Sequence, residues 1–271
     1  MKNIILTLIF ACLSGNLLAA SPEKVYTVGV VPQQSASKLA KTWGPLLKHV
    51  SDQTGIKLRF TTAPDIPEFE KRLSKGEYDF SYMNPYHYTV FSAKPGYQAL
   101  MNAKDKRIKG ILVVRKDSNI TGLEELAGEK LAFPSPAAFA ASILTRGEFS
   151  QRDIAITPEY VSSHDSVYRT VAKGLYPAGG GVMRTLKALS PDIQEQLRIL
   201  WTTPGYTPHA LAAHPDIDAD VAEKFTDAMI SLADSETGKK LLVPLKINGW
   251  QKASDSDWDD VRKLDIRLLD G

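Results

Sequence analysis

The sequence has almost no cysteine, and its single copy lies in a segment that we expect to be removed. Cys12 is the only cysteine among 271 residues. If the chain is cut after Ala19 or Ala20, the mature protein has no thiol. That excludes a disulfide framework, catalysis by a thiolate and metal sites built from thiolates.

Charge of one sign and long apolar runs are also scarce. Lysine and arginine number 33, aspartate and glutamate number 31, and the two signs are interspersed. A nearly neutral chain has no electrostatic reason to bind nucleic acid or an anionic membrane, so we expect neither as a partner. Beyond the first twenty residues, no apolar run approaches the roughly 20 residues that a membrane span needs.

The N-terminal residues have the order of features found in a secretory signal peptide. Lys2 supplies a positive start, residues 4–10 are apolar except for Thr7, and small residues precede the polar stretch that begins at Ser21. We therefore expect residues 1–20 to be a signal peptide and the protein to be exported. An uncleaved membrane anchor is one alternative, and lipid attachment to Cys12 is another.

Motifs of catalysis, nucleotide binding and metal binding are absent as well. The sequence has no nucleophile elbow, no P-loop and no dinucleotide fingerprint. No Lys-Ser/Thr pair follows the glycine run 179–181, so we interpret that run as a loose turn. The histidines lie at positions 49, 87, 164, 209 and 214. Their spacing matches no metal site, and we expect no enzyme activity, no metal and no cofactor.

Strands and helices alternate along the chain after the signal peptide. The expected strands lie at 26–31, 56–61, 78–82, 98–103, 110–115, 130–133, 157–161 and 196–201. The expected helices lie at 35–53, 67–73, 84–91, 136–147, 164–173, 182–189 and 218–233, followed by a mainly helical tail. This alternation predicts mainly parallel sheets with helices on both faces.

The strand–helix units occur in two series, which predicts an α/β protein with two lobes. We assign residues 21–108 and 203–271 to the first lobe and residues 109–202 to the second. The chain would then cross between the lobes twice, near Gly110 and near Trp201.

Three junctions between a strand and a helix carry residues suited to ligand contact. They are the segments 81–86, 133–140 and 162–168. Each follows the carboxyl end of an expected strand, where open α/β sheets bind ligands. The first turn of a helix also offers unpaired N–H groups to an anion. The alternative is that these are ordinary capped junctions.

Particular side chains at these junctions have expected roles. Tyr82 can line a pocket, and Asn84 is a good cap for the helix that follows it. We expect Ser135 to cap a helix with Pro136 in its first turn, where small residues let a ligand approach the backbone.

Several short motifs occur in an order and spacing that point to one family. They are Gly29-Val-Val-Pro32, Gly76-Glu-Tyr-Asp-Phe80, Asn84-Pro85, Arg115-Lys-Asp-Ser118, Leu123-Glu-Glu-Leu-Ala-Gly128, Ser135-Pro136 and Ser163-His164-Asp165. From about residue 26 to residue 258 the chain resembles the periplasmic binding proteins of phosphonate, phosphite and phosphate ABC importers.

The resemblance implies a type 2 periplasmic-binding fold with a ligand cleft between two lobes joined by two crossing segments. It also implies a monomer in the periplasm whose partners are a small ligand and an inner-membrane ABC permease. A ligand sensor of the same fold, acting on a membrane kinase or cyclase, is the alternative.

The sequence departs from that family where the ligand would bind. The family's phosphonate binders have the turn Asp-Pro-x-Ser-x-Ser-Gly, but residues 135–141 replace its hydroxyls by methyls and the ring of Phe139. Relatives that bind aminoalkyl phosphonates have carboxylates where this sequence has Arg184 and His209, by approximate alignment. His164 matches the family's pocket histidine.

The resemblance therefore implies ligand-binding roles for Phe139, Ala140, His164, Arg184 and His209. It implies a small anionic ligand that is not a simple phosphonate. The ligand would be either anionic at both ends or an oxyanion attached to an apolar group that packs on Phe139.

Overall fold

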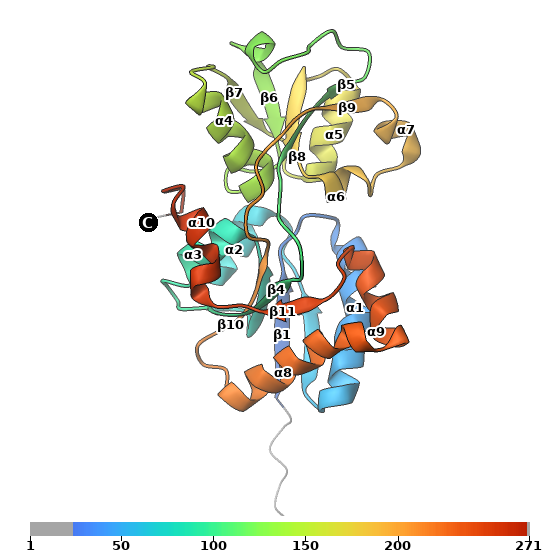
Figure 1. Ribbon diagram of the computed structural model, residues 1–271, viewed down its shortest axis with the longest axis vertical. Helices are drawn as coiled ribbons and strands as arrows, with labels where there is room; N and C mark the ends of the chain where they lie inside the picture. Colours follow the sequence, from blue (N-terminus) through green and yellow to red (C-terminus); the bar gives the residue numbers. More distant parts are fainter. Residues whose placement is uncertain (1–23, 270–271) are drawn as a thin grey trace, which may run out of the picture.

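Two β-sheets, each covered by helices, form the framework of the protein (Figure 1). The structure is a computed structural model that describes residues 24–269. The predicted signal peptide and Cys12 lie outside the described residues. Within residues 24–269, no helix is both long enough and apolar enough to cross a membrane.

The first sheet has six strands in the order β11-β4-β10-β3-β1-β2. These strands are β1 (Val25–Val30), β2 (Lys57–Thr61), β3 (Phe80–Met83), β4 (Gln98–Ala103), β10 (Ala210–Ala213) and β11 (Trp250–Lys252). The helices around it are α1 (Ala36–Thr54), α2 (Ile66–Ser74), α3 (Pro85–Phe91), α8 (Ala219–Ser231), α9 (Glu236–Leu242) and α10 (Asp259–Arg262). Short 3-10 turns η3 (Leu232–Asp234), η4 (Val243–Leu245) and η5 (Asp255–Trp258) connect the last helices.

Helix α1 shows how the sequence specifies these elements. The Ser35 hydroxyl accepts a hydrogen bond from the backbone N–H of Lys38, which caps the start of the helix. Gly55 ends it in the left-handed conformation that favours glycine. Its apolar stripe is buried in the core of the lobe and consists of Leu39, Trp43, Leu46, Leu47 and Val50. Their spacing, mostly three or four residues, puts these side chains on one face of the helix.

The second sheet has five strands in the order β7-β6-β8-β5-β9. These strands are β5 (Ile111–Arg115), β6 (Lys130–Phe133), β7 (Thr157–Tyr160), β8 (Ala178–Gly181) and β9 (Leu197–Thr202). Its helical segments are η1 (Glu124–Leu126), the π-helical η2 (Phe139–Leu144), α4 (Thr145–Gln151), α5 (His164–Ala172), α6 (Met183–Leu186) and α7 (Pro191–Gln194).

Both sheets are mixed, so the prediction of mainly parallel sheets was wrong. In the first sheet, β10 runs antiparallel to β3 and β4, and β11 runs antiparallel to β4. In the second sheet, β5 runs antiparallel to β8 and β9. The chain leaves the first sheet after β4 and returns through β10, which enters it in the opposite direction to β3. Strands β10 and β11, of four and three residues, were not predicted.

The glycine run 179–181 is part of the buried strand β8 and not a loose turn. β8 pairs with β5 on one side and with β6 on the other. A Cβ on Gly180 would collide with the carbonyl oxygen of Ala141, and one on Gly181 with the hydroxyl of Tyr168. The glycines therefore allow the strand to lie against neighbouring backbone and side chains.

Ser135 does not cap a helix, contrary to the prediction. The helical segment begins at Phe139, four residues later, and Ala138 precedes it without a side-chain cap. The Ser135 carbonyl accepts a hydrogen bond of 2.6 Å from the Ser142 hydroxyl. The Ser135 hydroxyl itself is buried and has no partner among the described residues. At this junction the chain forms the π-helical segment η2 and not the capped α-helix that was predicted.

Two crossing segments, 104–110 and 203–209, connect the sheets through the middle of the molecule (Figure 1). They are hydrogen-bonded to each other, because Ile108 and Tyr206 exchange backbone hydrogen bonds of 2.8 and 2.9 Å. The Thr203 hydroxyl also accepts from the backbone N–H of Gly110. The two segments therefore form a paired connection between the lobes.

Direct hydrogen bonds also hold the two lobes together. The Asn84 side-chain amide donates to the carbonyl oxygen of Ala137 at 3.1 Å. Lys38, in the first turn of α1, donates through Nζ to the carbonyl oxygen of Ala188 at 2.9 Å. The lobes are thus in direct contact at two places.

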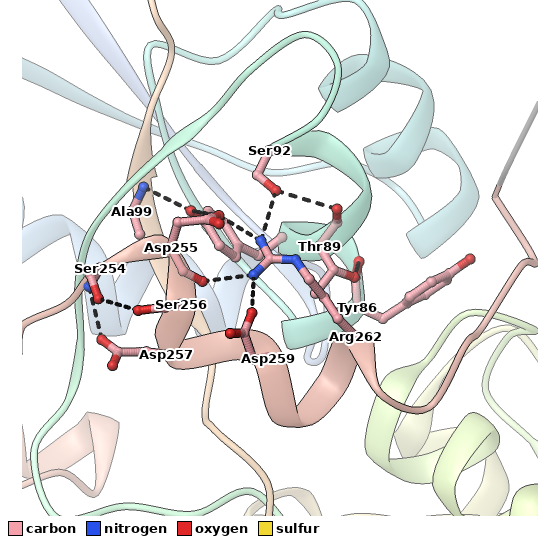
Figure 2. A network of polar contacts seen from close by, with 11 residues as sticks. Tyr86, Thr89, Ser92, Ala99, Ser254, Asp255, Ser256, Asp257, Asp259 and Arg262 are labelled. Carbon is pink, nitrogen blue, oxygen red and sulfur yellow. Dashed lines mark hydrogen bonds and ion pairs between the residues drawn. The ribbon is translucent and has the colours of Figure 1, made fainter.

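The C-terminal segment is anchored to the first lobe by a polar network (Figure 2). Arg262 of α10 donates to Asp255 at 2.6 Å and to Asp259 at 2.9 Å. Asp255 also accepts from the hydroxyl of Tyr88, and that hydroxyl accepts from the backbone N–H of Ala99. The network ties the end of the chain to α3 and β4.

Candidate ligand-binding site

A small cavity at the lobe interface brings together five of the predicted site residues. Its lining includes Asn84, Phe139, Ala140, His164 and His209. The first and last of these belong to the first lobe, and the other three belong to the second. The cavity volume is about 10 Å³, which is about the space of one water-sized group. A larger group would enter only if the lobes moved apart.

Asn84 caps α3, as predicted, and its amide also bridges the lobes. Its Oδ1 accepts from the backbone N–H of His87 at 2.7 Å. Its Nδ2 lies 3.0 Å from His87 Nε2 and donates to the Ala137 carbonyl oxygen. Because the protein already uses both ends of this amide, Asn84 supports the closed arrangement of the lobes.

His164 presents a free ring nitrogen in the buried interface. It is the first residue of α5, whose cap is the hydroxyl of Ser163. The preceding Ser162 has a φ of 70°, a left-handed conformation that is uncommon for residues other than glycine. Burial lowers the pKa of His164 to about 4, so its ring is neutral near pH 7. The Nδ1 atom has no hydrogen-bond partner among the described residues.

Tyr82 and His209 form the inner wall beside this cavity. The ring of Tyr82 lies 4.9 Å from that of Trp43 and 4.9 Å from that of His209. His209 Nε2 lies 2.8 Å from Gln33 Nε2. Burial, and then the charge of Arg184, lower the pKa of His209 to about 3. His209 is therefore a neutral hydrogen-bonding group, and the positive charge near it is that of Arg184.

A second, larger cavity of about 470 Å³ adjoins the small one. The two cavities share Gln33, Ile108, Val182 and His209 as lining residues. Tyr82 and the half-buried Arg184 of α6 also line the larger cavity. Burial raises the pKa of Tyr82, and the charge of Arg184 opposes that increase. Arg184 has no carboxylate within ion-pair distance in the described part of the chain.

The charged residues that line the larger cavity are all basic. Besides Arg184 they are Lys106, Arg107, Lys109, Lys187 and Lys246. They come from the first crossing segment, from α6 and its end, and from the turn after η4. Neither aspartate nor glutamate is among the described lining residues. The chemistry of this wall suits an anion.

A family sequence model described as "ABC transporter, phosphonate, periplasmic substrate-binding protein" matches residues 28–258. The chain belongs to this family. Its members are receptors that bind a small ligand for an inner-membrane permease, which agrees with the expectation that the protein is not an enzyme. The resemblance drawn from the short motifs is thereby confirmed.

Known members of the family and solved structures are similar to this chain over most of its length. The phosphate-import protein PhnD of Mycolicibacterium smegmatis is 25% identical over 225 residues, which cover 75% of this chain and 70% of that protein. A binding-protein component of an ABC phosphonate transporter from Pseudomonas aeruginosa has a TM-score of 0.81 at 18% identity. That match covers 90% of this chain and 86% of the other.

PhnD1 from Prochlorococcus marinus, solved in complex with methylphosphonate, has a TM-score of 0.80 at 18% identity. The match covers 89% of this chain and 97% of that one. These likenesses confirm the two-lobed α/β fold of the periplasmic binding proteins.

The structure does not bring every predicted site residue to the same place in this receptor. Ser135 is buried but lines neither of the two cavities. Tyr82 and Arg184 line only the larger cavity, whereas His209 lines both. Among residues 24–269, no three histidine, aspartate or glutamate side chains are placed to hold a metal ion.

Sequence reasoning missed Gln33 and most of the basic residues of the larger cavity. Gln33 follows β1 and lies at the carboxyl end of that strand, so the rule applied to the other three junctions would have found it. The lysines belong to no motif. Residues 106 and 246 are far apart in the sequence. They line the same cavity only because the crossing segment and the turn after η4 both border it.

Proposed function

We propose that this receptor is exported to the periplasm and captures a small anion between its two lobes, with Arg184 as the group that holds the anion's charge. The observation that carries the proposal is the position of Arg184. It lines the larger interlobe cavity beside Tyr82 and His209, and no described carboxylate is close enough to neutralise it. An arginine side chain suits the role, because its planar fork binds carboxylate or phosphate oxygens in pairs.

The surrounding residues supply hydrogen bonds without adding charge. His164 and His209 are buried and neutral, and His164 Nδ1 has no protein partner in the described part of the chain. A buried polar atom without a partner costs about 1–3 kcal/mol, and a ligand atom that bonds to it would recover that cost. We assign Asn84, Phe139, Ala140 and Gln33 to the walls that enclose the ligand.

The same geometry supports a ligand that is not a simple phosphonate. Ala138, Phe139 and Ala140 line the small cavity and offer no side-chain hydroxyl to phosphonate oxygens. The ligand would therefore depend on Arg184, the histidines and Gln33 for its polar contacts.

Entry of any ligand group into the small cavity requires the lobes to open, because that cavity holds no more than about one water-sized group. We propose that residues 21–108 with 203–271, and residues 109–202, move as the two units about the paired crossing segments. Hinge closure of this kind is a common response of two-domain receptors to ligand. Breaking the Asn84–Ala137 hydrogen bond would favour the open state.

The test of the proposed function is native mass spectrometry of the protein purified from the cell envelope. We expect a monomer whose chain begins near Ser21 and that retains a small anion. A chain that keeps its first residues, or a retained molecule without anionic groups, would contradict the proposal.

Closure and the role in transport are tested with the molecule that mass spectrometry identifies. X-ray scattering should show a smaller radius of gyration with the anion than without it, and Asn84→Ser, which keeps a helix cap without adding charge but lacks the amide donor, should weaken the change. Cells without the protein should lose uptake of the anion. Normal uptake with a lost response to the anion would instead identify a sensor.

A further inference from the structure

The larger cavity concentrates positive charge in a protein that is nearly neutral overall. The chain has a formal net charge of +2, yet six basic residues and no described acidic residue line this one cavity. Arg107 is the exception in being neutralised, because it lies 2.6 Å from Asp260. The five other cations have no ion-pair partner within residues 24–269.

Three of these cations lie close enough to affect one another. The pKa of Lys246 is lowered, first by partial burial of its amino group in an otherwise exposed side chain and then by the charges of Arg184, Lys187 and Lys38. Lys246 ends η4 in the left-handed conformation, with a φ of 56°. Mutual repulsion among these cations opposes folding, so the cluster is not explained by stability.

The size and walls of the cavity indicate an organic ligand. Its volume of about 470 Å³ is within the range of about 300–1,000 Å³ that is typical of sites for organic molecules. Aliphatic side chains line it between the cations, among them Ile108, Val182, Leu245 and Ile247. A single tetrahedral oxyanion would use neither this space nor these apolar walls.

The cations also lie at different depths. Arg184 is half-buried beside His209 and Tyr82, whereas Lys187 and Lys246 are exposed at the solvent side of the same cavity. A cleft lined by charges of one sign concentrates the electrostatic field, so exposed lysines can contribute to binding there. Two separated positions for negative charge follow from this arrangement.

We propose that the ligand is an organic anion with two separated anionic groups, one at Arg184 and His209 and the other at Lys187 and Lys246. This inference rests on the proposed function and narrows its ligand class. An aliphatic body of a few carbon atoms would lie between the two groups, against Val182 and Ile247. The competing ligand, a single oxyanion on an apolar group, would leave the two lysines without a role.

The test compares two probes that differ only in the second anionic group. The first probe is propylphosphonate, and the second is 3-phosphonopropionate, which has a carboxylate in place of the terminal methyl group. Each is titrated by calorimetry into protein that has been unfolded and refolded to remove any bound ligand. Wild-type protein should bind 3-phosphonopropionate at least about tenfold more tightly, a factor that corresponds to about 1.4 kcal/mol. The advantage should shrink at higher salt, because exposed charges are screened.

A double variant shows whether the two lysines cause that preference. Lys187→Gln with Lys246→Gln should remove most of the advantage, because it should weaken binding of 3-phosphonopropionate much more than binding of propylphosphonate. The control pair Lys116→Gln and Lys240→Gln removes the same charge from exposed positions outside the cavity and should bind both probes like wild type.

The outcomes separate this inference from the proposed function. Equal affinity for the two probes, or a preference that persists in the Lys187/Lys246 variant, overturns the inference but leaves a receptor for single oxyanions. Failure of both probes to bind also overturns the inference, and a retained molecule that carries no charge overturns the proposed function as well.

Discussion

The ring of Tyr82 stacks on the imidazole of His209, with 4.9 Å between the ring centroids and 18° between the planes. Gln33, which follows β1, also contacts the imidazole, and its Nε2 lies 2.8 Å from His209 Nε2. The stack keeps His209 away from water, and burial holds its pKa at about 3. An anion between the lobes therefore meets a neutral imidazole, so its charge must be balanced by Arg184 and the lysines.

Two buried neutral histidines make the free energy of unfolding depend on pH. The pKa values of His164 and His209 are about 4 and about 3 in the folded protein, below the value of about 6.5 in an unfolded chain. As pH falls below about 6.5, the unfolded chain takes up protons that the folded protein does not, so stability decreases with acidification. Each histidine should cost roughly 2 kcal/mol of stability between pH 7.5 and pH 5.

Urea unfolding at these two pH values checks this prediction. His164→Asn and His209→Asn should each lose less stability on acidification than wild type, by roughly 2 kcal/mol. A pH dependence that is the same in wild type and both variants would show that these histidines do not titrate as the structure requires.

Simple phosphonates should bind this receptor poorly. Hydrogen bonds to a charged group contribute about 1.5–3 kcal/mol each, and Ala138 and Ala140 cannot donate any from their side chains. Calorimetry with methylphosphonate and 2-aminoethylphosphonate tests the prediction, and Ala138→Ser should gain affinity for methylphosphonate. Submicromolar binding of either compound to the wild type would mean that residues 135–141 bind phosphonate by another route.

Gly180 should be intolerant of any side chain. A Cβ at this position would collide with the backbone carbonyl of Ala141 in the neighbouring η2. We expect Gly180→Ala to destabilise the protein by about 1–3 kcal/mol or more, as overpacking does. Gly147→Ala is the matched control in the same lobe, because a Cβ there meets no atom within 4 Å.

Because Gly147 lies within α4, its replacement by alanine should stabilise the helix by about 0.5–1 kcal/mol. Urea denaturation of both variants measures the two changes. If Gly180→Ala were as stable as wild type, β8 could not lie as close to η2 as the structure places it.

The sequence was sufficient for the elements whose signals are local. Asn84 was recognised as a helix cap and the segment 162–168 as a helix start, and Asn84 and Ser163 each cap their helix through a side-chain hydrogen bond. The strands at β1 to β7 stand within a few residues of their predicted positions. Apolar spacing and capping residues depend on the nearest neighbours in the chain, so they can be read without knowledge of the packing.

Elements that depend on distant partners could not be predicted in this way. β10 consists of Ala-Leu-Ala-Ala, which has low strand propensity, and it is a strand because β3 and β4 flank it. The glycines of β8 are characteristic of turns when read alone, and only the close approach of Ala141 and Tyr168 explains them. Tertiary packing overrides local preference in both cases.

The site was predictable in part for the same reason. His164 was found from a short motif, and Arg184 and His209 from their place in an approximate alignment; the structure places all three at the lobe interface. Lys106, Lys187 and Lys246 lie in three separate segments and converge only in the folded chain. No local pattern marks a charge cluster that is assembled from such distant segments.

The most direct test of the account is the affinity of Arg184→Ala for the anion retained by the purified protein, measured by calorimetry together with the melting temperature. Because Arg184 is half-buried, we expect binding to weaken by roughly 2 kcal/mol, the lower end of the range for removing one side of a charge pair. Arg184→Lys should recover part of the loss, and Arg169→Ala, at an exposed position of α5, should bind like wild type. The melting temperature should stay unchanged in all three variants. If Arg184→Ala bound the anion as tightly as wild type, the central claim that this arginine holds the ligand's charge would be wrong.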